Sequence, residues 1–149
     1  MDSPLCLFLV IFALAERTSA GRCHNGWAPF QSNCYYFSTS VTTFKEAMIN
    51  CYGMSASLLE LQTYSEENWL NLQIQLRGNN HGVWLGYSDI QKEGQFVTLS
   101  AAKVLQYTNW SKGEPNNVNG IEHCTGYFVN TKSWNDCICA GQLHYVCKK

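Results

Sequence analysis

The chain contains 149 residues, of which 46% are hydrophobic and 14% are charged, with 10 basic and 11 acidic side chains. This length provides apolar material for one packed core but is short for two ordinary domains. No segment concentrates Lys or Arg beyond Lys148 and Lys149, which argues against a nucleic-acid-binding surface and a polybasic membrane patch. We therefore expect one domain whose partners are selected by the chemistry of a local site.

The amino-terminal segment is typical of a secretory signal peptide. Residues 5–14 form an unbroken apolar run followed by small residues ending at Ala20, although Asp2 stands where a basic residue is usual. A membrane anchor is the alternative, but an apolar run of about ten residues is too short for a bilayer, which requires roughly 20. We predict a signal peptide at residues 1–20 and a secreted, formally neutral domain without a membrane anchor at residues 21–149.

The cysteines indicate a disulfide-bonded domain. Cys6 would leave with the signal peptide, and the cysteines that remain are Cys23, Cys34, Cys51, Cys124, Cys137, Cys139 and Cys147. In an oxidising compartment, this odd number predicts three disulfides and one leftover thiol. The cysteine pattern alone does not select the pairing.

The first half of the domain predicts a β-hairpin and two helices. Residues 23–37 combine aromatic residues and turn formers without a helical period, as in a hairpin. Thr43 and Glu46 match a capping box, which begins a helix that ends at Gly53. Ser65 is the expected cap of a second helix. The residues predicted to lie along one apolar face of the first helix are Phe44, Ala47, Met48, Cys51 and Tyr52. The second helix has Glu66 and Glu67 in its first turn, runs through Trp69, Leu72 and Leu76, and stops at Gly78.

The second half predicts short strands around a long loop. Helical periodicity is absent from residue 83 onward, and the segments interpreted as strands and turns are 83–86, 96–99, 125–129, 133–136 and 144–147. Residues 106–122 are rich in Asn, Gly, Ser and Pro. A loop of this length either carries function or is disordered, and its chemistry favours function. The expected fold class is α+β.

The long loop and the segments after it supply a cluster of oxygen ligands. Its members are Glu114, Asn116, Asn117, Glu122, Asn135 and Asp136. Ca²⁺ binds roughly six to eight oxygens from carboxylates, amides and carbonyls, and a set without His or Cys suits Ca²⁺ better than Zn²⁺. A cis bond before Pro115 would direct the side chains on either side of it toward one point, whereas an ordinary turn is the alternative. These residues predict a calcium site.

This pattern resembles the C-type lectin family. The shared features are Glu-Pro-Asn, a carboxylate eight residues after the Glu, a cysteine two residues later, and Trp-Asn-Asp with a cysteine three residues after the Asp. Here they are Glu114-Pro115-Asn116, Glu122, Cys124, Trp134-Asn135-Asp136 and Cys139. Similar segments at 84–86, 93–96 and 109–110 extend the resemblance over nearly all of residues 21–149. It implies the C-type lectin fold, with two helices flanking antiparallel sheets and a long calcium-binding loop.

The resemblance also implies how the cysteines pair. The implied disulfides are Cys51–Cys147, Cys124–Cys139 and, as in the long form of the family, Cys23–Cys34. Cys137 is left over. For this thiol an intermolecular bridge that makes a homodimer, a buried free thiol and a reactive thiol all remain open.

In the family, such a ligand set binds Ca²⁺ and, through the ion, sugar. The implied calcium ligands are Glu114, Asn116, Glu122, Asn135 and Asp136, of which the first four would also contact the sugar. Val118 is a candidate for packing on the sugar ring, with loop filler as the alternative. Acids and amides alternate in the set, so each of two neighbouring hydroxyls meets an acceptor and a donor. Glu-Pro-Asn goes with mannose-type ligands in the family, which implies mannose, N-acetylglucosamine, glucose or fucose.

Two further predictions depend on the same resemblance. An auxiliary calcium site would use Asp89, Glu93, Asn117 and Glu122, but His123 stands where this site has an acid, and we expect that histidine to be solvent-exposed. Residues 109–111 form a glycosylation sequon. Because the resemblance places its tryptophan in the core, we do not expect Asn109 to be glycosylated.

Two other classes of function fit the sequence less well. A C-type lectin-like domain that binds a protein, with calcium only structural, commonly lacks part of the ligand set, which is complete here. Enzyme motifs such as Gly-x-Ser-x-Gly and His-Glu-x-x-His are absent, and Glu114 and Glu122 would be poor glycosidase groups when engaged by calcium. A zinc site from Cys137, Cys139 and His144 conflicts with the implied disulfide. We predict a secreted, non-enzymatic, calcium-dependent lectin for mannose-type glycans, as in pathogen recognition in innate immunity.

Overall fold

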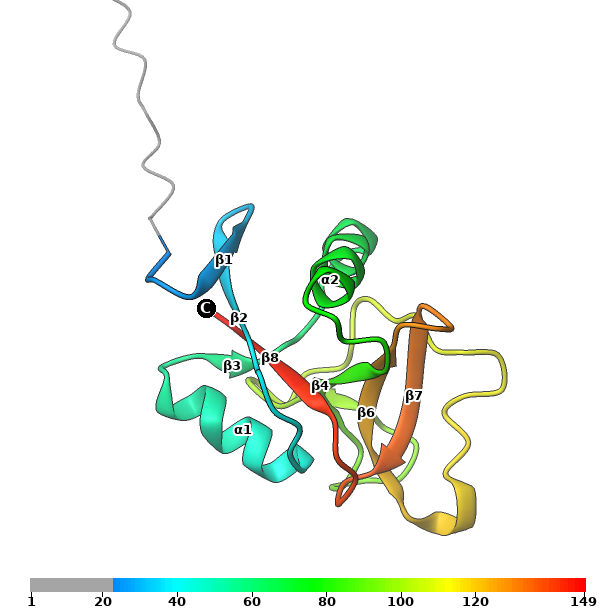
Figure 1. Cartoon of the computed structure of the whole chain (residues 1–149). Helices are drawn as coiled ribbons and strands as arrows, with labels where there is room; N and C mark the ends of the chain where they lie inside the picture. Colours follow the sequence, from blue (N-terminus) through cyan, green and yellow to red (C-terminus); the bar gives the residue numbers. More distant parts are fainter. Residues whose placement is uncertain (1–22) are drawn as a thin grey trace, which may run out of the picture.

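The structure is a computed structural model that describes residues 23–149, so the predicted signal peptide lies outside the described residues. Two helices and a set of short strands make up the domain (Figure 1), which confirms the α+β class. The elements are β1 (Trp27–Phe30), β2 (Asn33–Phe37), α1 (Phe44–Gly53), β3 (Ser57–Leu58), α2 (Tyr64–Leu76), β4 (Gly82–Ser88), β5 (Val97–Thr98), the 3-10 turn η1 (Val118–Gly120), β6 (Glu122–Phe128), β7 (Ser133–Ile138) and β8 (His144–Lys148).

The strands are joined in the order β1-β2-β8-β4-β6-β7, with β3 added at β8 and β5 added at β4. Between residues 23 and 149 every strand pair is antiparallel except β4 and β8, which are parallel. The predicted antiparallel sheets are therefore present, with this one parallel pair as an addition. The last strand, β8, returns to the middle of the sheet between β2 and β4 (Figure 1). It pairs antiparallel with β2 and β3 and parallel with β4.

Both helices begin with a threonine cap. In α1 the Thr43 hydroxyl accepts a hydrogen bond from the Glu46 backbone N–H, and the Glu46 carboxylate accepts one from the Thr43 N–H, which confirms the capping box. In α2 the Thr63 hydroxyl accepts from the Glu66 N–H at 3.1 Å. The prediction of Ser65 as the cap is wrong by two positions, because the hydroxyl three residues before Glu66 has the spacing that reaches the exposed N–H group.

The packed face of α1 is narrower than predicted, and the packed face of α2 includes charged residues. Met48 and Tyr52 of α1 are 38% and 83% exposed, and Leu72 and Leu76 of α2 are 55% and 70% exposed. Each exposed α1 residue follows a buried one by a single position, about 100° further around the helix, and so leaves the packed stripe. In α2 the buried face contains two glutamates, so the positions of the apolar residues do not by themselves identify the buried face. The buried residues are Phe44, Ala47 and Cys51 in α1 and Glu66, Glu67, Leu70 and Ile74 in α2.

One of these glutamates anchors the long loop. The carboxylate of Glu67 accepts hydrogen bonds from Tyr107 Oη at 2.7 Å, Asn109 Nδ2 at 2.6 Å and Trp134 Nε1 at 3.3 Å. These donors belong to the start of the loop and to β7, so Glu67 joins α2 to both. The Asn109 amide also donates to the Lys132 backbone oxygen at 2.8 Å. This engagement agrees with the expectation that Asn109 is not glycosylated.

Two hydrophobic clusters fill the domain. One lies beneath α2 and contains Leu70 and Trp134, and the other lies beneath α1 and contains Phe44 and Trp84. Within the described range no helix has the length and apolar character needed to cross a bilayer.

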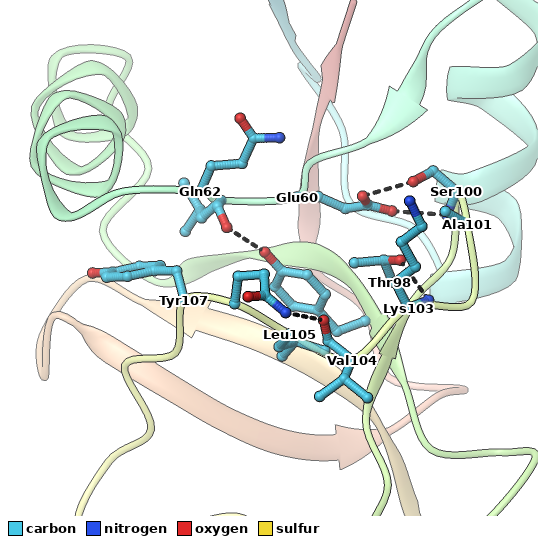
Figure 2. A pocket seen from close by; sticks show the side chains of 12 residues that line it. Glu60, Gln62, Thr98, Ser100, Ala101, Lys103, Val104, Leu105 and Tyr107 are labelled. Atoms are coloured by element: carbon cyan, nitrogen blue, oxygen red, sulfur yellow. Dashed lines mark hydrogen bonds between the residues drawn. The ribbon is translucent and has the colours of Figure 1, made fainter.

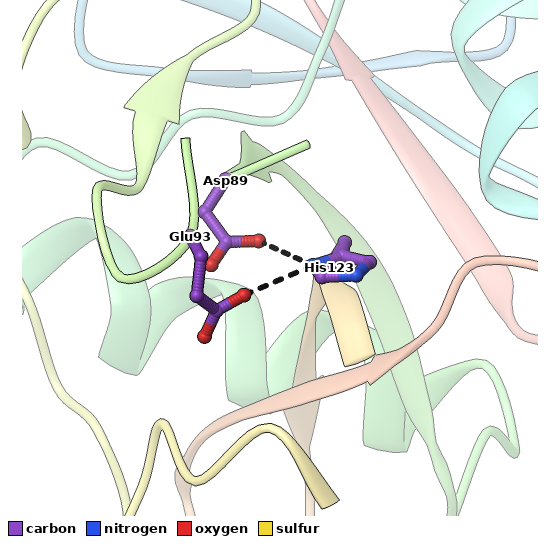
Figure 3. A group of neighbouring side chains, drawn as sticks. All are labelled: Asp89, Glu93 and His123. Carbon is purple, nitrogen blue, oxygen red and sulfur yellow. Dashed lines mark hydrogen bonds and ion pairs between the residues drawn. The ribbon is translucent and has the colours of Figure 1, made fainter. Parts of the chain in front are cut away.

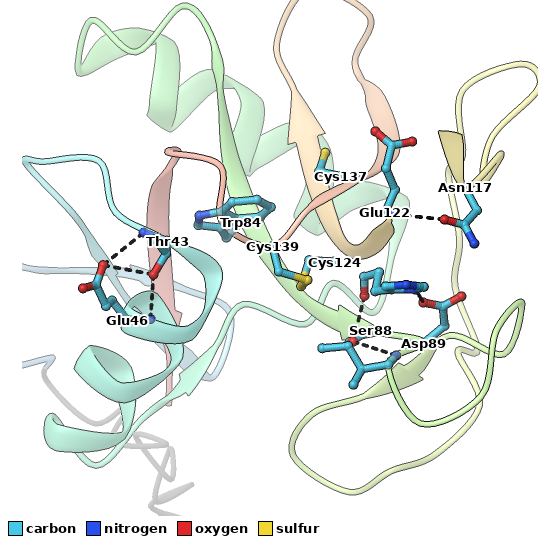
Figure 4. Close-up of a disulfide and its surroundings, with 12 residues drawn as sticks. Thr43, Glu46, Trp84, Ser88, Asp89, Asn117, Glu122, Cys124, Cys137 and Cys139 are labelled. Atoms are coloured by element: carbon cyan, nitrogen blue, oxygen red, sulfur yellow. Dashed lines mark hydrogen bonds and ion pairs between the residues drawn. A yellow bond between two sulfur atoms is a disulfide. The ribbon is translucent and has the colours of Figure 1, made fainter. Parts of the chain in front are cut away.

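Three disulfides brace these clusters, in the pairing that the resemblance implies. Cys51–Cys147 joins α1 to β8 across 96 residues. Closing a loop of that size contributes about 4 to 5 kcal/mol in the chain-entropy model. Cys124–Cys139 fastens β6 to the end of β7, as Figure 4 shows, and the third bridge, Cys23–Cys34, lies at the first hairpin.

Candidate metal-binding site

The predicted calcium ligands come together where the long loop meets β6 and β7. Asp136 of β7 is 1% exposed. Its Oδ1 accepts a hydrogen bond from the Asn116 backbone N–H at 3.1 Å, and its Oδ2 accepts one from the Asn117 N–H at 2.7 Å. A buried carboxylate on a strand therefore holds the middle of the loop against the sheet.

The other ligand side chains of the loop are linked to one another. Asn116 Nδ2 donates to Glu114 Oε1 at 2.9 Å, and the Glu114–Pro115 peptide bond is cis. The Val118 N–H donates to Asn116 Oδ1 at 3.1 Å and to Glu122 Oε2 at 3.0 Å. Acid and amide side chains thus lie next to each other around a short stretch of backbone. The Val118 side chain is 48% exposed beside them.

Two buried oxygens in this cluster have no hydrogen-bond partner. They are Glu114 Oε2 and Asn135 Oδ1. A buried acceptor without a partner costs about 1 to 3 kcal/mol, and more if it is charged. A hard cation would satisfy both atoms, and their carboxylate and amide chemistry suits Ca²⁺. The residues present therefore fit the ion that the sequence pattern implies.

The electrostatics of the cluster also favour a cation. Burial raises the pKa of Glu114 from 4.5 to about 7, and the neighbouring negative charges of Asp136 and Glu122 add to the increase. Three carboxylates with no Lys or Arg paired to them in residues 23–149 repel one another. A bound cation would reverse this repulsion.

Cys137 lies directly beside the ligands. Its thiol donates a weak hydrogen bond to the Asn135 backbone oxygen at 3.6 Å, and Figure 4 shows its sulfur pointing away from the Cys124–Cys139 disulfide. Burial, followed by the charges of Glu122 and Asp136, raises its pKa to about 12. A thiol that stays protonated at neutral pH is a poor nucleophile. Of the three fates left open by the sequence, these surroundings argue against a reactive thiol, whereas the intermolecular bridge and the buried free thiol stay predictions.

The predicted auxiliary site is only partly assembled. Asp89 and Glu93 lie together, but with His123 and not with Glu122 (Figure 3): among residues 23–149 these three are the one group of acid or histidine side chains whose ligand atoms all lie within 4.8 Å of one another. The expectation that His123 is simply solvent-exposed is wrong, because its side chain is 33% exposed and its Nδ1 contacts both carboxylates. Asn117 Oδ1 instead accepts from the Glu122 N–H at 3.0 Å.

A separate cavity of about 570 Å³ lies between residues 60–62 and residues 98–107, with Tyr87 of β4 also in its lining. The residues that line it include Glu60, Ser100, Lys103, Leu105 and Tyr107 (Figure 2). The Glu60 carboxylate is engaged by the N–H and hydroxyl of Ser100, both at 2.8 Å. None of the predicted calcium ligands lines this cavity, and the sequence pattern gave no signal for it.

The fold and the cluster define a class of protein: an α+β binding domain whose long loop presents carboxylate and amide oxygens beside a disulfide-braced sheet. Residues 40–149 match the family model described as the lectin C-type domain. The chain belongs to the C-type lectin family.

Individual relatives agree with this assignment. Perlucin of Haliotis laevigata is 32% identical over 85% of this chain and 83% of that protein, and CD209 antigen of Gorilla gorilla gorilla is 35% identical over 86% of this chain. The chain spans only 29% of the length of CD209 antigen. Among solved structures, the carbohydrate-recognition domain of cow CD23 in the presence of GlcNAc2Man3 oligosaccharide has a TM-score of 0.77 and 30% identity, covering 86% of this chain and 95% of that one. The comparisons indicate a non-enzymatic binding protein, as predicted.

Proposed function

We propose that this chain is a secreted carbohydrate-binding protein that recognises mannose-type sugars in a calcium-dependent manner. The proposed calcium ligands are Glu114, Asn116, Glu122, Asn135 and Asp136. The observation that carries the proposal is the pair of buried, unpartnered oxygens, Glu114 Oε2 and Asn135 Oδ1, within a cluster of acids and amides. A hard cation would stabilise this cluster, because it would bind the two oxygens that no hydrogen bond satisfies.

In the proposed sugar complex, each side chain has a role that follows from whether it accepts or donates hydrogen bonds. When bound, calcium supplies positive charge and open coordination positions for two neighbouring sugar hydroxyls. The carboxylates of Glu114 and Glu122 would accept hydrogen bonds from the sugar hydroxyls, and the amides of Asn116 and Asn135 would donate hydrogen bonds to the hydroxyl oxygens. Asp136 positions the loop through its bonds to backbone N–H groups.

The proposed sugar class has vicinal equatorial hydroxyls: mannose, N-acetylglucosamine, glucose or fucose. The proposal rests on the Glu-Pro-Asn residues 114–116, and the cow CD23 domain solved in the presence of a mannose-containing oligosaccharide is consistent with it. We assign packing on the sugar ring to Val118, because its side chain is 48% exposed and its backbone N–H bonds to Glu122. Recognition of glycans on microbial or cell surfaces by a secreted protein follows as the proposed role.

Retention on mannose-agarose tests this function. We expect the wild-type protein to be retained with Ca²⁺ and eluted by EDTA, and free mannose to compete better than galactose. Asn135→Ala removes one of the unpartnered oxygens and should abolish both calcium binding and retention. Asn80→Ala, a change of the same kind at an exposed position away from the cluster, is the matched control.

The rival function, protein binding with calcium only structural, predicts a different outcome. In that case the wild-type protein would bind Ca²⁺ in a titration but would not be retained by any sugar column. Retention that persists in excess EDTA would contradict the proposed mechanism itself.

A further inference from the structure

Asp89, Glu93 and His123 form a second polar cluster next to the proposed sugar site. His123 lies on β6, while Asp89 follows the last residue of β4 and Glu93 lies in the turn after it. His123 Nδ1 is 3.0 Å from Asp89 Oδ1 and 3.4 Å from Glu93 Oε2 (Figure 3). In a tetrahedral zinc site with bonds of about 2.0 Å, neighbouring ligand atoms lie about 3.3 Å apart. The two distances from the histidine nitrogen are therefore close to this spacing, and the two carboxylate oxygens lie within 4.8 Å of each other.

The surrounding backbone holds these side chains in place. Asp89 Oδ2 accepts a hydrogen bond from the Gly94 N–H at 2.8 Å, which leaves Oδ1 directed at the histidine. The His123 backbone oxygen accepts from Ser88 Oγ at 2.7 Å and from the Asp89 N–H at 3.3 Å. Metal ligands whose other atoms are fixed in this way lose little freedom on binding.

The charge of the cluster calls for a cation. Asp89 is 1% exposed, and its only ion-pair partner in the described part of the chain is His123. Buried carboxylates are normally paired with a cation or bound to a metal. Two carboxylates against one imidazole leave the cluster with an excess of negative charge that a divalent ion would neutralise.

The ligand types favour zinc over calcium. Calcium needs roughly six to eight oxygens, whereas this cluster offers two carboxylates and a nitrogen. The other two residues predicted for an auxiliary calcium site are engaged elsewhere, Asn117 with the Glu122 N–H and Glu122 with the Val118 N–H. Zinc accepts nitrogen and oxygen in four-coordinate sites, often with three protein ligands and one water. The Glu93 side chain is 56% exposed, so water has access to the fourth position.

From this geometry we infer that Asp89, Glu93 and His123 form a Zn²⁺ site, distinct from the proposed calcium and sugar site and independent of it. Zinc takes the position of the Nδ1 proton between the imidazole and the two carboxylates. The site ties the turn after β4 to β6, one residue from Glu122.

Zinc titration of the whole oxidised protein tests the inference. ZnCl₂ is added in saturating CaCl₂ at neutral pH, in competition with a chromophoric chelator, and we expect one zinc per chain. His123→Ala should weaken zinc binding on the order of 100-fold, and Glu93→Gln about tenfold. Because Glu93 is largely exposed, its variant also keeps the test valid if His123→Ala does not fold.

Two controls distinguish this site from incidental zinc binding. His24→Ala removes an exposed histidine at the first hairpin, and Cys137→Ser removes the free thiol. Zinc affinity that is unchanged in His123→Ala and Glu93→Gln, or that falls as far in either control, would overturn the inference. Co²⁺ substitution should give a four-coordinate spectrum without a thiolate charge-transfer band. Since no sugar is used, failure here leaves the mannose-retention result untouched.

Discussion

Replacing Glu114 by Gln should have opposite effects on stability with and without calcium. Without the ion, burial and the charges of Asp136 and Glu122 raise the pKa of Glu114 from 4.5 to about 7. A folded-state pKa above the ordinary value means that folding favours the protonated acid. The calcium-free native state therefore loses stability as the pH rises from 4.5 to about 7, and the loss persists at higher pH.

The magnitude follows from the size of the shift. Converted in full, it corresponds to about 3 kcal/mol. Because the Glu114 side chain is partly exposed, solvent screening reduces the effect to about 1 kcal/mol. Glutamine keeps the Oε1 acceptor for Asn116 and carries no charge. In EDTA above pH 7, Glu114→Gln should therefore raise the free energy of unfolding by about 1 kcal/mol, and below pH 4 it should leave it nearly unchanged.

Urea denaturation followed by tryptophan fluorescence provides the measurement. The difference in free energy between variant and wild type is compared across pH in EDTA, so that carboxylates titrating in both proteins cancel. In saturating CaCl₂ the order should reverse, because the variant lacks one carboxylate ligand. A difference that does not depend on pH, or a variant less stable than wild type in EDTA above pH 7, would refute the reasoning.

Three further substitutions test other contacts. Thr63→Ala should lower the free energy of unfolding by about 1 kcal/mol because α2 loses its cap, whereas Ser65→Ala should change it by less than about 0.5 kcal/mol. Glu67→Gln places an amide against the hydrogen-bond donors of the long loop and β7, and should cost about 2 kcal/mol in the same urea assay. Cys137→Ser should leave the size of the protein without reductant unchanged, and a dimer lost in the variant would instead show an intermolecular bridge.

Local signals in the sequence predicted their structures well. The capping box at Thr43 and Glu46 depends only on residues three positions apart, and the first hairpin only on neighbouring turn formers and aromatics. The burial of Glu67 on α2 has no local signature in the sequence, because its hydrogen-bond donors come from residues 40 or more positions away. The parallel pairing of β8 with β4 likewise depends on the whole course of the chain.

In both polar clusters, the sequence indicates which residue types are present but not which distant residues come into contact. Residue types and spacing suggested the members of the proposed calcium site, but the contact of Asp136 with backbone N–H groups 19 and 20 residues earlier emerges only in the folded chain. At the second cluster, the sequence shows that a histidine replaces an expected acid at position 123. It does not show that the imidazole faces Asp89 and Glu93 at hydrogen-bonding distance.

The proposed sugar site depends on a buried connection that begins in α2. Glu67 receives the indole N–H of Trp134, which directly precedes Asn135 and Asp136, and also receives donors from Tyr107 and Asn109 at the start of the loop. One carboxylate thus fixes both the strand that carries the last ligands and the loop that carries the first. The loop can remain largely without regular structure and still present its oxygens at fixed positions, because its two supports are tied to the same buried atoms.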